Sequence, residues 1–395
     1  MSRGIVISGL GALCPRAAGR KALWDLFPRD GSEPLLPRGA IPPALERIPE
    51  PVLELLPAPP RHMDRLGRLL LAATTLALED SRLGSAAGDP LRTGIAMGSG
   101  YGCLPTNEEY LEGILERGSR YGNPVVFQNT VTNAATGSIS VVHDLRGPNA
   151  TLCSGWAAGL EALDFGCQQL EEGLAARMVV GSADTPSKRL VEGMSLQGWL
   201  SPHGTALPFA EDSDGTRVSE AACTLVLEEV SQARARGAHL YAEVAGTGRR
   251  GGPLEEQART LARAVSDAVH AARIEPEQLG AVFSGANGRR DFDGCEGRAL
   301  REALGPWASR VPVTCPKSVL GETFSAAGPL AVLLGALALD TGWVPGTPRG
   351  TIPASASPFN LVAGASRRLE PEWVLITALG DEGSALAVVL RRSAP

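Results

Sequence analysis

One strand–turn–helix plan occurs twice in this chain, and this repetition constrains its fold more than any other feature. In the first half, a strand at residues 151–153 passes through small residues into a helix with an apolar seam from Leu160 to Leu170. In the second half, a strand at 311–314 precedes a helix over 325–340. Alternating strands and helices predict parallel sheets, so we expect two similar α/β halves sharing a core. Chance similarity between apolar strands is the alternative.

The rest of the pattern predicts further strands and two surface insertions. Short apolar runs typical of buried strands lie at residues 5–8, 93–97, 178–180, 222–227 and 281–283. A helix begins near 63–65, and residues 105–118 predict an exposed helix. Residues 28–60 are rich in proline and lack periodicity, which predicts a surface excursion. We therefore divide the chain into halves at 1–235 and 236–395, with excursions at 28–60 and 100–130.

Composition excludes several classes of function. The net charge of −6 gives no basic surface for nucleic acid, and seven scattered cysteines form no CxxC or Cys/His cluster that would hold a metal. The N-terminus lacks the apolar core of a signal peptide, and we find no apolar run of membrane-spanning length. Gly9-Leu10-Gly11 lacks the third glycine of a dinucleotide fingerprint, so we expect no cofactor. A cytoplasmic protein without a membrane partner is expected.

Position 156 is a tryptophan where this architecture normally presents a reactive side chain. The strand–turn–helix at 147–160 ends in a helix N-terminus, where free backbone N–H groups and the helix dipole favour an anion. An indole cannot attack a carbonyl group or carry an acyl chain. Cys153, three residues earlier, is predicted to be a buried residue of the strand rather than a substitute nucleophile.

Five stretches of the chain, taken in order, resemble one known family. They are residues 5–15, 63–65, 133–149, the run 208–222 that contains Pro-Phe and Asp-Gly, and 317–328 with its lysine. In this order they resemble the β-ketoacyl synthases of the thiolase fold, over nearly the whole chain. The resemblance implies two similar βαβ halves in a five-layer α-β-α-β-α arrangement.

The same resemblance implies that the catalytic positions are degenerate. Active members of the family use a cysteine nucleophile and two histidines, and these positions match Trp156, Gly285 and Glu322 here. The loop that helps to form the oxyanion hole matches 380–384, which reads Gly-Asp-Glu-Gly-Ser, and only Lys317 is retained. The five histidines, at 62, 143, 203, 239 and 270, lie elsewhere in the pattern. We therefore expect no catalytic residues, no cofactor and no metal.

One branch of the family has this character. The chain-length factors of type II polyketide synthases resemble ketosynthases without a working site, and each pairs with an active ketosynthase. Like them, this chain has a small-residue run at 286–288 followed by Asp291 and Asp293. They usually carry glutamine at the nucleophile position, so Trp156 departs from them too. The resemblance implies a heterodimer that receives chains on an acyl carrier protein and controls product length.

Two other functions stay open from the sequence. The first is a homodimeric thiolase-fold enzyme with different chemistry, such as acyl transfer, ester hydrolysis or Lys317-assisted catalysis. The second is a binding or scaffold protein for acyl carrier proteins.

Several local expectations accompany these alternatives. One possibility is that Trp156 fills the space of an acyl chain and that Glu322 accepts a hydrogen bond from its N–H. The other is that Trp156 is an ordinary core residue, left at this position after the sequence drifted. Lys317 and Glu322 could instead form a structural ion pair that has no catalytic role. We expect the acidic residues that follow position 290 to form a solvated face; these are Asp291, Asp293 and Glu296.

Overall fold

Two sheets are joined through their central strands in the structure, which is a computed structural model. It describes residues 4–35, 45–50, 52, 60–83, 89–349 and 359–393. Strand β1 (Ile5–Cys14) pairs antiparallel with β9 (Ala242–Gly251) through Ile5–Ile7, which merges the two sheets into one. Because β1 belongs to the first half of the chain and β9 to the second, the halves share one hydrogen-bonded frame.

Each half contributes one arm of the sheet. From β1 outward, the first arm contains β8 (Ala221–Glu229), β6 (Arg177–Asp184), β4 (Thr93–Gly98) and β5 (Asn149–Leu152). From β9 outward, the second arm contains β16 (Ser384–Arg391), β15 (Trp373–Leu379), β10 (Ala281–Phe283), β11 (Pro312–Thr314) and β13 (Asn360–Leu361). In both arms the outer strands are parallel and the strands next to the centre are antiparallel, so the two arms have the same plan.

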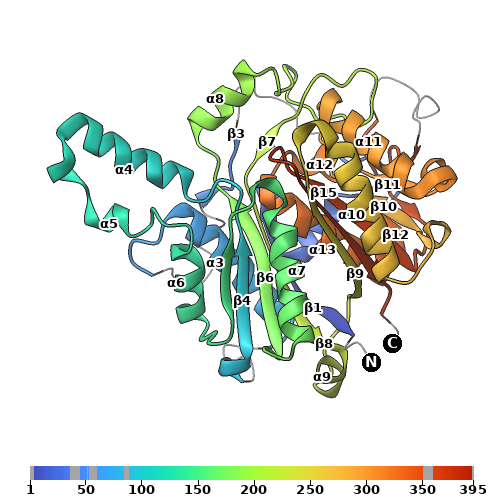
Figure 1. The fold of residues 1–395 in the computed structure, drawn as a ribbon, viewed down its shortest axis with the longest axis horizontal. Helices are drawn as coiled ribbons and strands as arrows, with labels where there is room; N and C mark the ends of the chain where they lie inside the picture. The colour runs from blue at the N-terminus through green and yellow to red at the C-terminus, as the bar shows by residue number, and fades with distance from the viewer. Residues whose placement is uncertain are drawn as a thin grey trace.

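Helices form three layers around the two arms (Figure 1). The central helices are α7 (Ala158–Glu171) and α13 (Ala327–Thr341), which pack together between the sheets. The outer layers are α3 (Arg65–Asp80) with α6 (Ala134–Val142), and α10 (Gln257–Ala271) with α11 (Arg290–Leu304). This five-layer arrangement confirms the predicted thiolase-like fold. The division at residue 235 stays a prediction.

The remaining elements are short connections between these layers. They are β2 (Ala17–Ala18), α1 (Arg20–Asp25), η1 (Pro90–Arg92), η3 (Gly155–Ala157), α8 (Lys188–Leu196), α9 (Val230–Ala235), η4 (Leu254–Glu256), η5 (Pro276–Gln278), η6 (Gly305–Ser309), α12 (Lys317–Leu320), η7 (Phe324–Ala326), β12 (Trp343–Val344) and β14 (Arg367–Arg368).

The segment Phe324–Thr341 is long and apolar enough to cross a membrane, so the expectation that no run reaches this length was wrong. It is 83 % buried inside the structure, because η7 and α13 lie between the two sheets. A helix that is apolar on every side is the expected composition for a central layer covered on both faces.

Glycines allow the two central helices to approach closely. A Cβ at Gly159 in α7 would lie 2.3 Å from the carbonyl oxygen of Ser325, and one at Gly328 in α13 would lie 2.7 Å from Leu160. Side chains at these positions would force the helix N-termini apart. The small residues therefore determine how near the first turns of the two helices come to each other.

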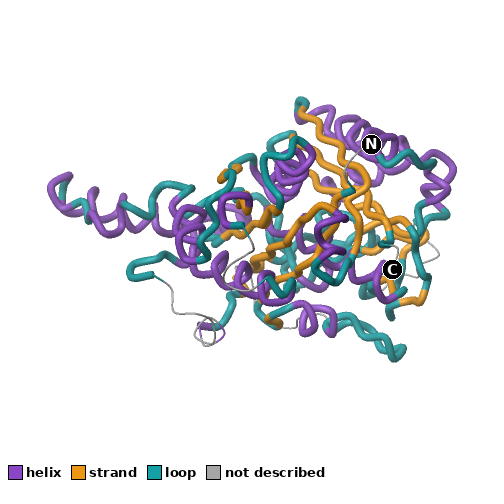
Figure 2. Tube along the Cα trace, turned by 90° about the horizontal axis from the view of Figure 1, so that it is seen from below, coloured by secondary structure: helices purple, strands orange, loops and turns teal. Residues whose placement is uncertain are grey.

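A helical arm projects from the first half (Figures 1 and 2). It consists of α4 (Leu104–Arg117), η2 (Ser119–Tyr121) and α5 (Pro124–Phe127), and α4 has no buried residue. The predicted exposed helix at 105–118 is confirmed.

The proline-rich excursion at 28–60 is described only in part, because 36–44, 51 and 53–59 lie outside the described residues. Within the described part, β3 (Leu45–Glu46) pairs with β7 (Val218–Ser219), and Ile48 is buried. The expectation of a purely surface segment was therefore wrong at this point, since Ile48 packs with α3.

Candidate functional site

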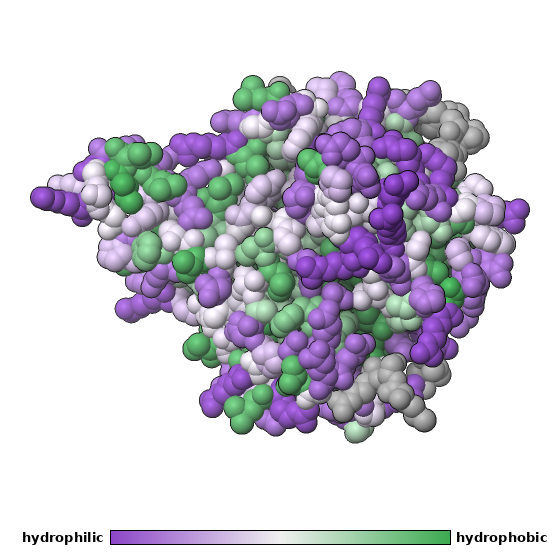
Figure 3. Space-filling view, viewed as in Figure 1, coloured by the Kyte–Doolittle hydropathy of each residue, from purple (hydrophilic) through white to green (hydrophobic). Residues whose placement is uncertain are grey.

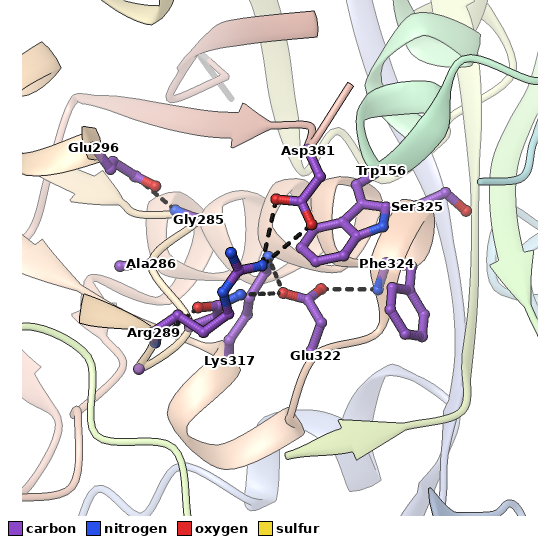
Figure 4. Close-up of polar contacts among 12 residues, drawn as sticks. Trp156, Gly285, Ala286, Arg289, Glu296, Lys317, Glu322, Phe324, Ser325 and Asp381 are labelled. Carbon is purple, nitrogen blue, oxygen red and sulfur yellow. Dashed lines mark hydrogen bonds and ion pairs between the residues drawn. The ribbon is translucent and has the colours of Figure 1, made fainter. Parts of the chain in front are cut away.

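The N-termini of the two central helices meet at one site. Each helix begins with a short 3-10 turn, η3 before α7 and η7 before α13. Trp156 from the first turn and Phe324 from the second face each other, with ring centroids 5.3 Å apart at 66° (Figure 4). Phe324 has a φ of +53°, an unfavourable conformation for an aromatic residue. Its ring packs against both Tyr101 and Trp156.

Trp156 is buried, with 4 % of its surface exposed. Its indole N–H donates to the hydroxyl of Tyr101 at 3.1 Å, and its ring also packs against Phe292. Burial raises the pKa of Tyr101 to about 12, so this hydroxyl stays neutral at physiological pH. The predicted hydrogen bond from Trp156 to Glu322 was wrong, because the indole and the carboxylate each have other partners.

Asp184, at the end of β6, holds both sides of this aromatic cluster. Its carboxylate accepts hydrogen bonds from the hydroxyl of Ser99 and from the backbone N–H groups of Gly100 and Tyr101. It also accepts from the N–H and hydroxyl of Ser325, at 3.0 and 2.6 Å. Burial raises the pKa of Asp184, so its hydrogen bonds only partly offset the loss of water. One side chain thereby ties β4 to the start of α13.

Glu322, which we predicted to stand at a histidine position of the family pattern, is completely buried. Its Oε2 accepts from Nζ of Lys317 and from the side-chain amide of Asn287, both at 2.8 Å. Its Oε1 accepts from the backbone N–H of Phe324 at 2.9 Å. The predicted Lys317–Glu322 ion pair is confirmed. Each oxygen of this carboxylate therefore accepts at least one hydrogen bond from a neighbouring protein group.

Lys317, which we predicted to be the retained family residue of this site, is also buried. Its Nζ lies 5.5 Å from the ring centroid of Phe292 and 5.9 Å from that of Trp156. The ammonium group is therefore enclosed by Glu322 and two aromatic rings. Its amine pairs with Glu322, and Lys317 also lines the small cavity at this site.

Gly285, which we predicted to stand at the other histidine position, contacts a second buried carboxylate. Its N–H donates to Oε1 of Glu296 at 2.8 Å, and this oxygen also accepts from the hydroxyls of Ser284 and Thr377. A Cβ at position 285 would lie 3.1 Å from Oε2 of Glu296. Any side chain at this position would therefore press against that oxygen.

The prediction that the acidic residues after position 290 form a solvated face was wrong for two of the three. Glu296 is completely buried and Asp293 is 4 % exposed, whereas the side chain of Asp291 is 71 % exposed. Asp293 accepts from the backbone N–H groups of Asn287, Gly288 and Phe209. Burial raises its pKa to about 7. Asp293 thus holds the loop that positions Asn287 for Glu322.

Arg289 connects this loop to the loop at 380–384. Its guanidinium forms ion pairs with Asp291 and with Asp381, and it stacks 3.9 Å from the ring centroid of Trp199. We predicted from the family pattern that 380–384 matches the loop that helps to form the oxyanion hole. Here Asp381 places a carboxylate there, and Arg289 compensates its charge.

The turn before Trp156 is also covered by an acidic side chain. Gly155 has a φ of +69°, and a Cβ there would lie about 2 Å from the carboxylate of Glu382. Cys153 does not lie inside β5 but just beyond its end, and its side chain is exposed. The prediction that Cys153 is buried was therefore wrong. Its thiol stands outside the aromatic cluster.

Little empty space remains at this site. A cavity of about 20 Å³ lies between Trp156, Gly285, Lys317 and Thr377. This volume holds about one water molecule. Trp156 and Phe324 both line this cavity.

The histidines lie away from the site, as the sequence predicted. His143 contacts Thr75, and His239 contacts Asp340. Among the described residues, no group of three His, Cys, Asp or Glu side chains is placed to hold a metal ion.

The structure thus brings together Trp156, Lys317 and Glu322, with Gly285 at the edge of the same cavity. Sequence reasoning missed Tyr101 and Phe324 as partners of the indole. It also missed the structural roles of Asn287 and Asp293, although an acidic residue a few positions after a glycine-rich turn is a usable signal. Such a carboxylate often accepts hydrogen bonds from the free N–H groups of the turn.

Comparisons with known proteins agree with this geometry. The family model described as β-ketoacyl synthase, N-terminal domain, matches residues 2–233, and that for the C-terminal domain matches 240–351. The chain is 33 % identical to a Streptomyces coelicolor protein described as a polyketide β-ketoacyl synthase 2, covering 100 % of this chain and 96 % of that protein.

Two solved structures share the whole fold. The ishigamide ketosynthase/chain length factor has a TM-score of 0.90 at 22 % identity, with 100 % of each chain covered. A type II polyketide synthase acyl-carrier protein in complex with its ketosynthase bound to the hexaketide has a TM-score of 0.88 at 21 % identity, again covering 100 % of each chain.

Replacing Lys317 by alanine should destabilise the protein by about 3–5 kcal/mol, because Glu322 would stay buried without its counter-charge. Urea unfolding followed by circular dichroism measures this loss. The double variant Lys317→Met with Glu322→Gln removes both charges and should recover most of the stability. Equal losses in the single and double variants would contradict the ion-pair explanation.

Stability should decrease as pH rises from about 4 to about 7, because Asp293 binds its proton more tightly in the folded state than in the unfolded chain. The pKa is about 7 in the fold and about 3.9 when unfolded, so the protonated form contributes stability that ionisation removes. The slope is at most about 1.4 kcal/mol per pH unit. Chemical unfolding of the wild type and of Asp293→Asn at several pH values isolates this contribution; identical pH profiles would refute it.

Proposed function

Because the chain belongs to the β-ketoacyl synthase family, we propose that it is a chain-length factor, a non-catalytic subunit that pairs with an active ketosynthase in type II polyketide or related polyene biosynthesis. One observation carries this proposal. The nucleophile position holds Trp156, whose indole is buried and hydrogen-bonded to Tyr101. A side chain that cannot form a thioester fills the place where the acyl chain would be attached.

The residues at the other predicted catalytic positions also support a non-catalytic subunit, because each lost catalytic group lowers the rate of condensation. Condensation needs a thiolate nucleophile and neutral acid–base groups near the enolate. Loss of one such group typically costs about 10²–10⁴-fold in rate, and loss of one oxyanion donor about 10²–10³-fold. Here Trp156, Gly285, Glu322 and the loop at 380–384 are all changed. Glu322 and Asp381 are moreover committed to ion pairs.

A partner-facing surface is available on the first half. Strand β5 is the last strand of its arm, so one of its edges is unpaired within the described sheet. On α6 beside it, Val141 is 82 % exposed and Val142 is 40 % exposed. An open strand edge next to exposed apolar side chains is a typical interface for a partner sheet. We infer that the active ketosynthase covers it.

The projecting arm supports a role in measuring the acyl chain. Apolar side chains gather on it (Figure 3), and those exposed between residues 111 and 127 are Leu111, Leu115, Tyr121, Val125 and Phe127. An isolated protein rarely exposes such a cluster unless a partner covers it. We infer that the arm reaches the partner and helps to wall its acyl tunnel, which receives the chain from an acyl carrier protein.

The alternative of a homodimeric enzyme with different chemistry is less well supported. Such an enzyme would most directly use Lys317 as its amine. That amine is paired with Glu322 and enclosed by aromatic rings.

We expect the chain to co-purify at 1:1 with a co-expressed ketosynthase that contains the Cys-His-His site. Val141→Asp should abolish this, because it would bury a carboxylate in the proposed interface, while leaving the fold of the isolated chain intact. Size-exclusion chromatography of the co-expressed pair measures the assembly.

Leu369→Asp is the matched control, since Leu369 is exposed and its backbone bonds to Gly342 at the C-terminal end of α13, in the second half. It should assemble normally. A stable homodimer of this chain that ignores the ketosynthase and turns over acyl thioesters would overturn the proposed function.

Trp156→Cys alone should restore no condensation, because Gly285 and Glu322 still replace the two histidines. The assay combines the variant with a ketosynthase whose own nucleophilic cysteine is replaced by alanine, so that any product must come from this chain. Ketoacyl product above the level of the wild-type chain in the same assay would contradict the prediction.

A further inference from the structure

The projecting arm is attached to the body mainly through polar contacts. Helix α4 has no buried residue, so no apolar core fixes its direction. At its base, the hydroxyl of Thr106 donates to Asp64 at 3.0 Å, and Asp64 also caps the first turn of α3. Within the arm, Tyr110 packs on Phe127 with ring centroids 5.5 Å apart. These contacts hold the base and the turn of the arm, and its middle needs a separate support.

That support comes from α8. The hydroxyl of Ser187, which caps α8 by accepting from the N–H of Leu190, donates to Glu108 at 2.7 Å. Arg189 donates both to Glu108, at 3.4 Å, and to Glu112 one turn further along α4. Because Glu108 and Glu112 are four residues apart, they lie on one face of α4 and present two carboxylates to one guanidinium.

We propose that Arg189 is a positioning residue for product length, which acts by fixing the angle of the arm. This inference rests on the proposed function and adds a specific determinant to it. Arg189 need not touch the acyl chain. It determines how far the apolar side chains of α4 and α5 reach towards the partner's tunnel.

Helix α4 is long enough for a small change in its angle to move its far end by the length of one acyl extension. Fourteen residues of helix extend about 21 Å, so a swing of about 10° moves the far end by about 4 Å. One two-carbon extension lengthens an acyl chain by about 2.5 Å, the span of two C–C bonds of about 1.5 Å at a tetrahedral angle. A small change in the angle of α4 therefore equals about one extension unit.

The ion pairs of Arg189 with Glu108 and Glu112 are exposed to solvent, so we expect them to weaken as the salt concentration rises. The side chains of Arg189, Glu112 and Glu108 are 61 %, 48 % and 23 % exposed. Exposed ion pairs are weak and are screened further by salt. They cannot decide whether the protein folds, but they can bias the orientation of an arm that has little else to fix it.

The test uses the assembled pair with malonyl-loaded acyl carrier protein and compares product lengths by mass spectrometry. Arg189→Ala should change the ratio of the main product to its nearest neighbour in length by about two- to fivefold, the effect that an exposed ion pair can contribute. Glu108→Gln should shift it in the same direction, and Arg189→Lys should restore it in part. High salt should shift the wild type but not Arg189→Ala.

Arg368→Ala is the matched control, because Arg368 forms an equally exposed ion pair with Glu370 in the second half. It should leave product lengths unchanged. Failure of the wild-type chain to assemble would reject the proposed function itself. If the pair assembles and Arg189→Ala leaves the length distribution unchanged, or abolishes assembly instead, the positioning role is rejected while the proposed function stands.

Discussion

The close approach of the N-termini of α7 and α13 is the constraint on which the rest of the site depends. Gly159 and Gly328 allow the first turns of the two helices to touch, and the carboxylate of Asp184 ties one turn to the loop after β4. Two positive helix ends converge there, a place suited to an anionic intermediate. In this chain Trp156 and Phe324 fill the space between them.

The charges around this site show how its buried acidic residues are stabilised. Burying an uncompensated charge is expensive, so each new acidic residue needs a partner. Glu322 pairs with Lys317, and Asp381 pairs with Arg289. Asp293 accepts three backbone N–H groups, and its pKa rises because burial still outweighs them. These bonds connect the loop that contains Asn287 and Arg289 to Glu322 and to the loop at 380–384.

Local patterns predicted the fold well and predicted the side-chain contacts poorly. Strand β10 was predicted at its observed limits, and both central helices were predicted, because apolar periodicity depends on residues near in the chain. The Lys317–Glu322 pair was also foreseen, since the residues are five apart. The hydrogen bond from Trp156 to Tyr101 was not, because 55 residues separate them. Glu296 and Cys153 were misjudged because their exposure depends on which elements cover them.

The sequence by itself determined that this chain has the β-ketoacyl synthase pattern, and it predicted that Trp156, Gly285 and Glu322 stand at the catalytic positions, because residue identity at a motif position needs no coordinates. Only the tertiary structure decided which side chains surround these positions. Whether Trp156 fills the space of an acyl chain or only packs in the core depends on its contacts with Tyr101, Phe292 and Phe324. These residues come from three separate segments and meet only when the two halves pack. Hydrogen bonds and burial are properties of that packing, and a linear sequence does not contain them.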